Sequence, residues 1–270
     1  MPKISIIMGA YNCQDTICES IDSILAQTFK DWEFIICDDA STDETLMVLN
    51  RYKTNYPDKF VILHNENNMM LAGSLNRCLK VAKGKYIARM DADDLSEPTR
   101  LQKQYDYLKN NPDMDLVGTF MQGFDDEGLK DIVPIKIDPV DVDLPKANPF
   151  HHATIMMKKS VYDELNGYTV SKRTRRVEDV DLWFRFFSKG LKGHTIPEPL
   201  YLVRIDEGAY KRRKIRYSFD ASMVLFNGIK LLGLSPKYYI YTLKPIISQF
   251  IPKKLKIYYR IYKHGDNQSD

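Results

Sequence analysis

Short apolar segments rich in β-branched residues alternate with amphipathic segments over the first 110 residues of this chain. The apolar segments indicate strands, because they are short and end at polar or turn-forming residues. Strands that alternate with helices form right-handed βαβ units, which place the strands side by side in a parallel sheet. The sequence therefore predicts an α/β fold, Rossmann-like, with a mostly parallel central sheet flanked by helices. The expected strands are residues 3–8, 32–37, 60–63 and 86–90, and the expected helices between them are residues 17–25, 45–52 and 74–82.

Polar side chains follow the predicted strands at the points where the strands end. Ligands of parallel sheets bind at the carboxyl ends of the strands, so these positions are candidates for a functional site. The chain contains neither a GxGxxG nor a GxxxxGK[ST] motif, so carboxylates and a metal are the groups expected to hold a nucleotide. The candidates are Tyr11 and Asn12 after the first strand, Asp38 and Asp39 after the second, and the Asp-Ala-Asp-Asp run at 91–94 after the fourth.

The run at 91–94 places three carboxylates within four residues. Clustered carboxylates raise one another's pKa unless a cation or hydrogen-bond donors compensate for their charge. A Mg2+ or Mn2+ ion that bridges to substrate phosphates would do so, because hard cations prefer oxygen ligands. The alternative is a solvated turn in which Asp94 or Ser96 caps the next helix.

The second acidic strand end contains Asp39 and, a few residues later, Asp43. A carboxylate at this place can accept hydrogen bonds from a base N–H or from ribose hydroxyls, while Ser41 or Asp43 can cap the following helix. We expect Asp39 to be the ligand and Asp43 to be the cap. The helix after the first strand has Asp15 or Thr16 at its cap position.

The βαβ pattern ends near residue 110, after a helix expected at 98–109. Residues 116–159 contain short apolar runs separated by Gly, Pro and Asp, which indicates mixed strands and loops. Two further helices are expected at 160–165 and 178–188, because each ends at a glycine and the second has an aromatic apolar face.

Two residues of the helix expected at 178–188 each have two possible roles. Asp179 lies in the first turn, where an acidic residue complements the helix dipole, and it can equally serve as a catalytic carboxylate. Trp183 belongs to an aromatic stripe that is typical of a core, but its ring can also line an acceptor pocket.

Five stretches of the sequence together resemble the inverting family 2 glycosyltransferases, which have the GT-A fold. The resemblance covers about the first 205 residues, in the order of the family. Each motif alone is weak, whereas the ordered set is highly specific. The stretches are residues 4–12, 23–29, 38–43, 84–94 and 178–183.

The resemblance implies a role for individual residues. It implies that Asp93 binds the metal, Mn2+ or Mg2+, and that Asp179 is the catalytic base. The nucleotide is expected to contact Ala10, Tyr11, Asn12, Asp39, Asp91 and Ala92, and the substrates are further expected to contact His152, Glu178 and Trp183.

The sequence departs from the family pattern at two positions. Met70 stands where a glycine is usual, which puts a close backbone approach there in doubt, and Ala153 stands where a proline is usual. The QxxRW motif of processive, membrane-embedded synthases is absent, which indicates transfer of one sugar per visit.

The implied reaction is metal-dependent, inverting transfer of a single sugar from a nucleotide-sugar, a UDP-sugar, to a saccharide acceptor. Such a transfer needs one base for the acceptor hydroxyl and a metal on the departing diphosphate. The acceptor is expected to be lipid-linked or protein-linked and to belong to surface polysaccharide or glycoconjugate synthesis. A sugar-phosphate nucleotidyltransferase is one alternative, although residues 9–15 contain no basic side chain for a phosphate loop. A non-catalytic nucleotide-binding scaffold of the same fold is the other.

The last quarter of the chain differs electrostatically from the rest. Residues 210–270 contain 13 Lys or Arg against 3 Asp or Glu, whereas residues 1–209 contain 26 against 33. Basic and aromatic residues on amphipathic helices are typical of surfaces that lie on anionic membranes. We expect residues 210–263 to form either a peripheral membrane contact or a homo-oligomer contact. Nucleic acid is not an expected partner, because no nucleic-acid-binding motif accompanies the basic residues.

These patterns predict a GT-A glycosyltransferase domain at 1–209 and a basic, Tyr-rich helical extension at 210–270. The domain is expected to have a nucleotide-binding half at about 1–110 and an acceptor half at about 111–209. Four cysteines without a CxxC pair indicate reduced thiols and no structural zinc. No apolar segment is long enough to span a bilayer, so a cytoplasmic location is expected, either free or peripheral at the inner face of the cell membrane.

Overall fold

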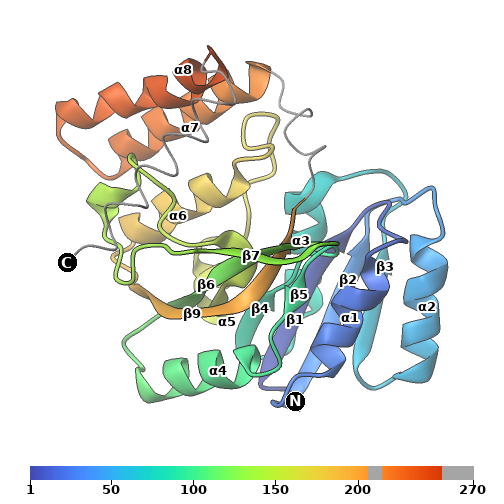
Figure 1. The fold of residues 1–270 in the computed structure, drawn as a ribbon. Helices are drawn as coiled ribbons and strands as arrows, with labels where there is room; N and C mark the ends of the chain where they lie inside the picture. The colour runs from blue at the N-terminus through green and yellow to red at the C-terminus, as the bar shows by residue number, and fades with distance from the viewer. Residues whose placement is uncertain (206–214, 251–270) are drawn as a thin grey trace.

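The computed structural model describes residues 1–205 and 215–250 of the 270-residue chain (Figure 1). Its centre is a nine-stranded sheet in the order β3-β2-β1-β4-β8-β6-β9-β5, and β7 pairs with β6 outside this path. Helices cover the sheet, so the predicted α/β class with a mostly parallel central sheet flanked by helices is confirmed.

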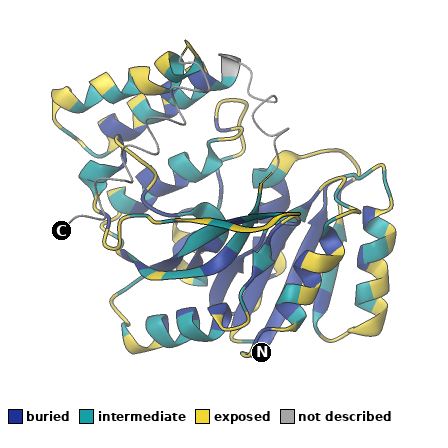
Figure 2. Cartoon of the chain, viewed as in Figure 1, coloured by how far each residue is buried: buried dark blue, intermediate teal, exposed yellow. Residues whose placement is uncertain are grey.

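The first half of the sheet consists of four parallel strands. Ile4 of β1 lies opposite Trp32 of β2 on one side and Tyr86 of β4 on the other, so the four strands end at the same edge. All seven residues of β2 are buried, which is the burial expected of a parallel strand covered on both faces (Figure 2). The strands are β1 (Ile4–Ala10), β2 (Trp32–Asp38), β3 (Phe60–His64) and β4 (Tyr86–Arg89).

Three helices connect these strands: α1 (Ile17–Leu25), α2 (Thr45–Asn55) and α3 (Met70–Val81). Alternate residues of β1 face opposite sides, so Ile6 packs in the core with α1 and Ile7 packs in the core with α3. The predicted bounds of α1 are confirmed. The predicted start of α3 was wrong, because the helix begins four residues earlier in a Met-rich stretch without a usual N-cap residue.

The second half of the sheet is mixed. β6 (Leu116–Asp125) runs antiparallel to β8 (Met156–Lys158) and parallel to β9 (Gly193–Arg204), while β7 (Gly128–Val133) forms a hairpin with β6. The short β5 (Leu95–Ser96) pairs with β9. The sequence did not predict β9, because Pro197 and Pro199 interrupt it and its register on β6 shifts twice.

The helices of the second half are α4 (Arg100–Asn110), α5 (Lys159–Glu164) and α6 (Glu178–Ser188). The predicted bounds of α6 are confirmed, and those of α5 are confirmed to within a residue. Gly167 ends the turn after α5 with a φ of +66° and donates its backbone N–H to the carbonyl of Tyr162 at 2.8 Å.

The described part of the C-terminal extension is helical, as predicted. It contains α7 (Ile215–Leu231), a 3-10 segment (Pro236–Leu243) and α8 (Lys244–Phe250), and α7 packs on α6 (Figure 1). Gly228 of α7 lies so close to the ring of Phe184 that an added Cβ would be 2.2 Å from it, so only a glycine fits there. No helix within residues 1–205 and 215–250 combines the length and apolar composition needed to cross a membrane.

Candidate active site

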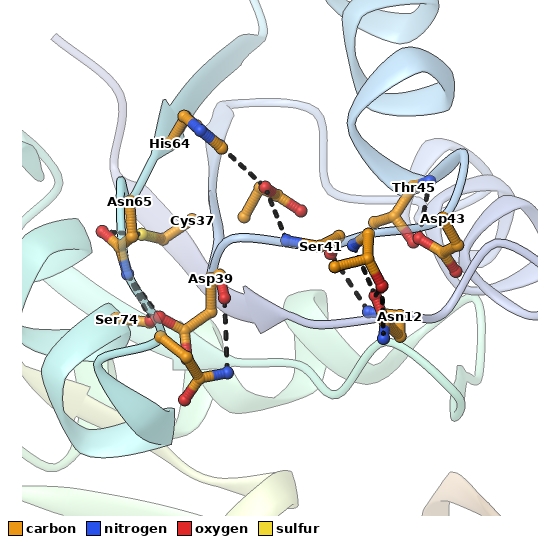
Figure 3. Close-up of polar contacts among 12 residues, drawn as sticks. Asn12, Cys37, Asp39, Ser41, Asp43, Thr45, His64, Asn65 and Ser74 are labelled. Atoms are coloured by element: carbon orange, nitrogen blue, oxygen red, sulfur yellow. Dashed lines mark hydrogen bonds and ion pairs between the residues drawn. The ribbon is translucent and has the colours of Figure 1, made fainter.

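The loops after β1 and β2 are joined by hydrogen bonds. Asp39 donates its backbone N–H to the carbonyl of Ala10 at 2.8 Å. The side-chain oxygen of Asn12, which lies beside Ser41 in Figure 3, accepts from the backbone N–H of Thr42 at 2.8 Å. Asn12 adopts a φ of +49°, a conformation that Asn tolerates better than most residues. Tyr11 is 51% exposed beside it, so an aromatic face is presented at this edge of the sheet.

Asp39 is buried at the carboxyl end of β2, and one of its carboxylate oxygens is fully engaged. Oδ1 accepts from the side-chain amide of Asn65 at 2.6 Å (Figure 3) and from the backbone N–H of Met69 at 2.7 Å. Among the described residues, none donates a hydrogen bond to Oδ2. The side chain is therefore oriented by α3 and retains one oxygen for a ligand, which suits the predicted contact with a nucleoside.

The two predicted helix caps, at Asp43 and Thr16, compare differently with the structure. Asp43 accepts from the backbone N–H of Thr45 at 3.0 Å and so contacts the first residue of α2 as expected, but the N-cap position of that helix is occupied by Glu44. Thr16 occupies the N-cap position of α1 but makes no side-chain cap bond. Its hydroxyl instead donates to the carbonyl of Ala92 at 3.0 Å, and Ser20 donates to the carbonyl of Asp91 at 2.8 Å. Helix α1 thus fixes the backbone of the acidic run.

The three carboxylates at 91–94 have three different environments. Asp91 accepts from the Arg89 guanidinium at 2.6 Å, and Asp94 is buried and accepts from the backbone N–H of Arg204 at 2.9 Å. The alternative in which Asp94 or Ser96 caps the next helix was therefore wrong, because α4 begins at Arg100 with Thr99 at its N-cap. Asp93 is exposed and has no side-chain hydrogen bond within the described part of the chain.

Asp93 is the carboxylate of the run that fits a divalent cation. Desolvation by the surrounding protein and the neighbouring charge of Asp91 raise the pKa of this carboxyl group, so a cation beside it would offset both effects. Within residues 1–205 and 215–250 no group of three or more His, Cys, Asp or Glu side chains is placed to hold a metal. A metal at Asp93 would therefore take its remaining ligands from phosphate oxygens and water, as Mg2+ commonly does in nucleotide sites.

Arg89 lies between the acidic run and α6, and sequence reasoning did not single it out. Its side chain is 4% exposed, it pairs with Asp91, and its Nε has no hydrogen-bond partner among the described residues. Although burial alone would lower its pKa, the charge of Asp91 raises it, so the guanidinium stays charged. The same positive charge acts on Glu178 and Asp179. An arginine at the end of an apolar strand, two residues before a carboxylate run, was the signal available.

Glu178 and Asp179 begin α6 and are half-buried. Burial raises the pKa of both carboxyl groups, and each lies within the electrostatic range of Arg89. The side-chain amide of Asn148 donates to Oδ2 of Asp179 at 3.2 Å and orients it. Asp181 has a structural role instead, because it accepts from Thr169 at 2.6 Å and from Arg185 at 2.8 Å.

His152 is held by aromatic neighbours in the space next to α6. Its Nε2 lies 2.8 Å from the hydroxyl of Tyr168, and its ring packs edge-on against Trp183 at 5.8 Å between centroids. Burial, followed by the charge of Arg89, lowers the pKa of His152 well below its usual value, so its imidazole is neutral. Trp183 is fully buried. It therefore supports His152 from the core, and the expected direct contact between Trp183 and an acceptor is not available in this packing.

Met70 keeps the backbone conformation that a glycine would adopt. Its φ is +63°, in the left-handed region, where a residue with a Cβ carries a cost of about 1–2 kcal/mol. The side chain is 37% exposed, so it does not crowd the interior. The first turn of α3 therefore has the shape expected of the glycine-containing family pattern despite the substitution.

Comparisons with known proteins are consistent with this geometry. The sequence model of glycosyl transferase family 2 matches residues 5–165. The chain is 47% identical over 251 residues to EpsE of Bacillus subtilis, which is named a glycosyltransferase, covering 93% of this chain and 90% of that protein. It is 30% identical over 231 residues to WfaP of Escherichia coli, a UDP-Glc:alpha-D-GlcNAc-diphosphoundecaprenol beta-1,3-glucosyltransferase, covering 85% and 88%.

Solved structures share the fold. S. aureus TarS 1-349 in complex with UDP-GlcNAc superposes with a TM-score of 0.70 at 16% identity, covering 90% of this chain and 73% of that one. The mannosyltransferase PcManGT from Pyrobaculum calidifontis, in complex with GDP-Man and Mn2+, gives a TM-score of 0.63 at 19% identity, covering 92% and 68%.

Proposed function

Since the chain belongs to glycosyl transferase family 2 and is a transferase with the GT-A fold, we propose that it performs a metal-dependent, inverting transfer of a single sugar. The donor is a UDP-sugar, and the acceptor is a saccharide in surface polysaccharide or glycoconjugate synthesis. TarS is known in complex with UDP-GlcNAc, and WfaP is named for transfer from UDP-Glc to a diphosphate-linked acceptor, which supports both parts of the proposal.

The observation that carries the proposal is the pair of carboxylate groups on either side of Arg89. Asp91 and Asp93 follow β4, whereas Glu178 and Asp179 begin α6. The buried guanidinium pairs with the first group and acts electrostatically on the second. An inverting transfer needs one carboxylate at the acceptor hydroxyl and a separate group at the departing diphosphate, and this arrangement offers both.

In the proposed reaction, the acceptor oxygen bonds to the anomeric carbon as the bond from that carbon to the diphosphate breaks. Asp179 takes the proton of the acceptor hydroxyl, and Asn148 keeps the receiving carboxylate oriented. A divalent cation held by Asp93 would stabilise the negative charge on the departing diphosphate. Asp39 and Tyr11 would hold the nucleoside at the ends of β1 and β2, and His152, being neutral, can donate or accept a hydrogen bond without adding charge.

The first test is UDP release from a panel of UDP-sugars, with Mn2+, with Mg2+ and with a chelator. We expect release from one donor in the presence of metal, and a loss of at least about a hundredfold in Asp93→Asn, because that variant removes the carboxylate proposed to hold the cation. Asp113→Asn is the matched control, since Asp113 is an exposed aspartate outside the site. Metal-independent release, or equal activity in both variants, would contradict the metal assignment.

We also propose that residues 1–209 form the glycosyltransferase domain, with the nucleotide held by about 1–110 and the acceptor by about 111–209. The proposed nucleotide contacts lie at the last residue of β1 or just after β1, β2 and β4, whereas Asp179 and His152 come from the later half of the chain. The C-terminal extension is proposed to lie on an anionic membrane surface at the inner face of the cell membrane. Exposed apolar side chains on its described helices support this: Phe219, Met223 and Phe226 on α7, and Ile247 and Phe250 on α8.

Vesicle sedimentation tests the membrane contact. We expect the protein to bind phosphatidylcholine vesicles only when they contain phosphatidylglycerol, and to lose this binding when Lys211, Arg212, Arg213 and Lys214 are changed to Gln, because the attraction depends on charge. These four positions lie outside the described residues. Phe219→Ser should weaken the binding as well, while Leu129→Ser, which changes an exposed apolar residue of β7, should not. Unchanged binding in the charge variant would contradict a charge-dependent membrane contact, and a wild-type protein that binds no vesicles would favour a contact between copies of the chain.

A further inference from the structure

A cavity of about 480 Å³ lies between the start of α3 and the segment that leads into α6. Its size is within the range of about 300–1,000 Å³ that small-molecule sites occupy. Its walls include Met69 and Met70 on one side, Lys172, Arg175 and Arg176 on the other, and Glu178 at its edge. Neither Asp91 nor Asp93 lines it, so the cavity is separate from the acidic run that follows β4.

Three cationic side chains converge on this cavity. Lys172, Arg175 and Arg176 are exposed, and none of them forms an ion pair with any residue in the described ranges. The guanidinium of Arg176 lies over the ring of Tyr217 of α7, 5.3 Å from its centroid. Uncompensated positive charge at the mouth of a cavity attracts anionic ligands.

The segment that carries these cations is held in place by Thr174. The Thr174 side chain is buried, its hydroxyl donates to the carbonyl of Thr169 at 2.7 Å, and it accepts from the backbone N–H of Ser171 at 3.2 Å. The backbone N–H of Val177 donates to the carbonyl of Thr174 at 3.0 Å and joins the segment to α6. The cations therefore project from an ordered turn, which lowers the entropic cost of binding a ligand.

The N-terminus of one helix adds to the positive potential of the cavity. The first turn of α3, a helix of 12 residues, contributes Met70 to Ala72, whereas α6 contributes the side chain of Glu178, whose carboxylate opposes an anion when ionised. Unpaired backbone N–H groups at a helix N-terminus favour phosphate groups. Here they accompany three cationic side chains, so the preference for an anion does not depend on the helix terminus alone.

The position of the cavity relative to Asp179 indicates which substrate carries the anionic group that would occupy it. Glu178 lines the edge of the cavity and is adjacent to Asp179, the proposed base. A sugar whose hydroxyl lies at these carboxylates would extend its remaining part toward Lys172 and Arg175. The donor diphosphate is instead expected at Asp93, which does not line the cavity.

We propose that Lys172 and Arg175, together with the first turn of α3, form a second phosphate-binding subsite, which holds a phosphate on the acceptor while its sugar hydroxyl faces Asp179. This subsite deepens the proposed function and rests on it. An acceptor that carries a sugar phosphate could fill this subsite, and the diphosphate of the donor could fill it as well. The experiment therefore distinguishes these two ligands.

The experiment is equilibrium calorimetry with N-acetylglucosamine 1-phosphate as the probe, in the presence of saturating UDP and Mn2+. We expect the probe to bind the wild type, and its affinity to fall at least about tenfold in Lys172→Gln/Arg175→Gln, because each substitution removes a charge-assisted hydrogen bond. Arg173→Gln is the matched control, since Arg173 lies in the same turn but faces a different cavity, and we expect it to bind normally. The methyl glycoside of N-acetylglucosamine, which lacks the phosphate, should bind equally to all three proteins.

Two other results are informative. If the probe does not bind beside UDP, but UDP itself binds about tenfold more weakly to Lys172→Gln/Arg175→Gln and normally to Arg173→Gln, the subsite serves the donor diphosphate and the acceptor assignment is overturned. If the double variant changes neither ligand, or if Arg173→Gln has the same effect as the double variant, the subsite itself is overturned. Calorimetry measures binding without turnover. The test of the subsite therefore gives a result even if the proposed transfer reaction does not take place.

Discussion

Asp179→Asn is expected to lower the rate of sugar transfer by about a thousandfold while UDP binds with unchanged affinity. A positioned general base typically contributes about a hundredfold to ten-thousandfold, and Asn has the shape of Asp without its basicity. UDP affinity should persist, because the proposed nucleotide contacts are at the ends of β1, β2 and β4 rather than in α6. Single-turnover transfer and calorimetric titration with UDP measure the two quantities separately.

The pH dependence of the same reaction follows from the environment of Asp179. Burial raises the pKa of its carboxyl group, and only the ionised form can accept the acceptor proton. We therefore expect transfer to be lost as the pH falls through this raised pKa, at a higher pH than an unperturbed aspartate would give. An acid limb in the pH profile of kcat that is unchanged in Asp179→Asn would contradict the assignment.

The stability of Asp179→Asn should change in the opposite direction from its activity. A carboxyl group whose folded-state pKa is raised favours folding when it is protonated, and this contribution is lost as the pH rises through the folded-state pKa. At neutral pH the wild type therefore bears the cost of a partly buried charge, and we expect Asp179→Asn to have a higher Tm.

The variant Glu178→Gln tests which of the two adjacent carboxylates is the catalytic base. If Glu178→Gln abolishes transfer while Asp179→Asn does not, Glu178 is the base.

Arg89→Met is expected to reduce the free energy of unfolding by about 3 kcal/mol. The Arg89 side chain is 4% exposed and pairs with Asp91 at 2.6 Å, and removing one partner of a buried ion pair costs about 3–5 kcal/mol because the other charge loses its compensation. We place the effect at the lower end because the side chain of Asp91 is 28% exposed and keeps some contact with water. Urea unfolding at neutral pH measures the change.

Two companion variants test whether charge causes this loss. Arg89→Lys keeps the positive charge and should lose less stability than Arg89→Met, although an ammonium group lacks the planar geometry of guanidinium. Adding Asp91→Asn to Arg89→Met removes the uncompensated carboxylate and should recover part of the lost stability. If the double variant is as unstable as the sum of its single variants, the pair is not coupled and Arg89 stabilises the fold only through packing.

The elements whose patterns are local could be predicted from the sequence. The apolar spacing of α1 and α6 gave their bounds, and the strands of the parallel half were found with errors of one or two residues at their ends. β9 could not be found this way, because two prolines and a shifting register hide its pairing with β6. Pairing between distant segments depends on contacts that local periodicity does not record.

The sequence by itself determined which residues lie at the ends of the parallel strands, because alternation of strands and helices places those ends on one edge. It thereby indicated Asp39 and the acidic run at 91–94. Only the tertiary structure decided how each side chain is used. Arg89 gained its position from the burial of β4 between distant segments. Trp183 became core because the rings of Phe150 and His152 pack against it, and Thr16 supports the carbonyl of Ala92 instead of capping its helix. Burial and partners are properties of packing, and packing brings together residues that are far apart in the chain.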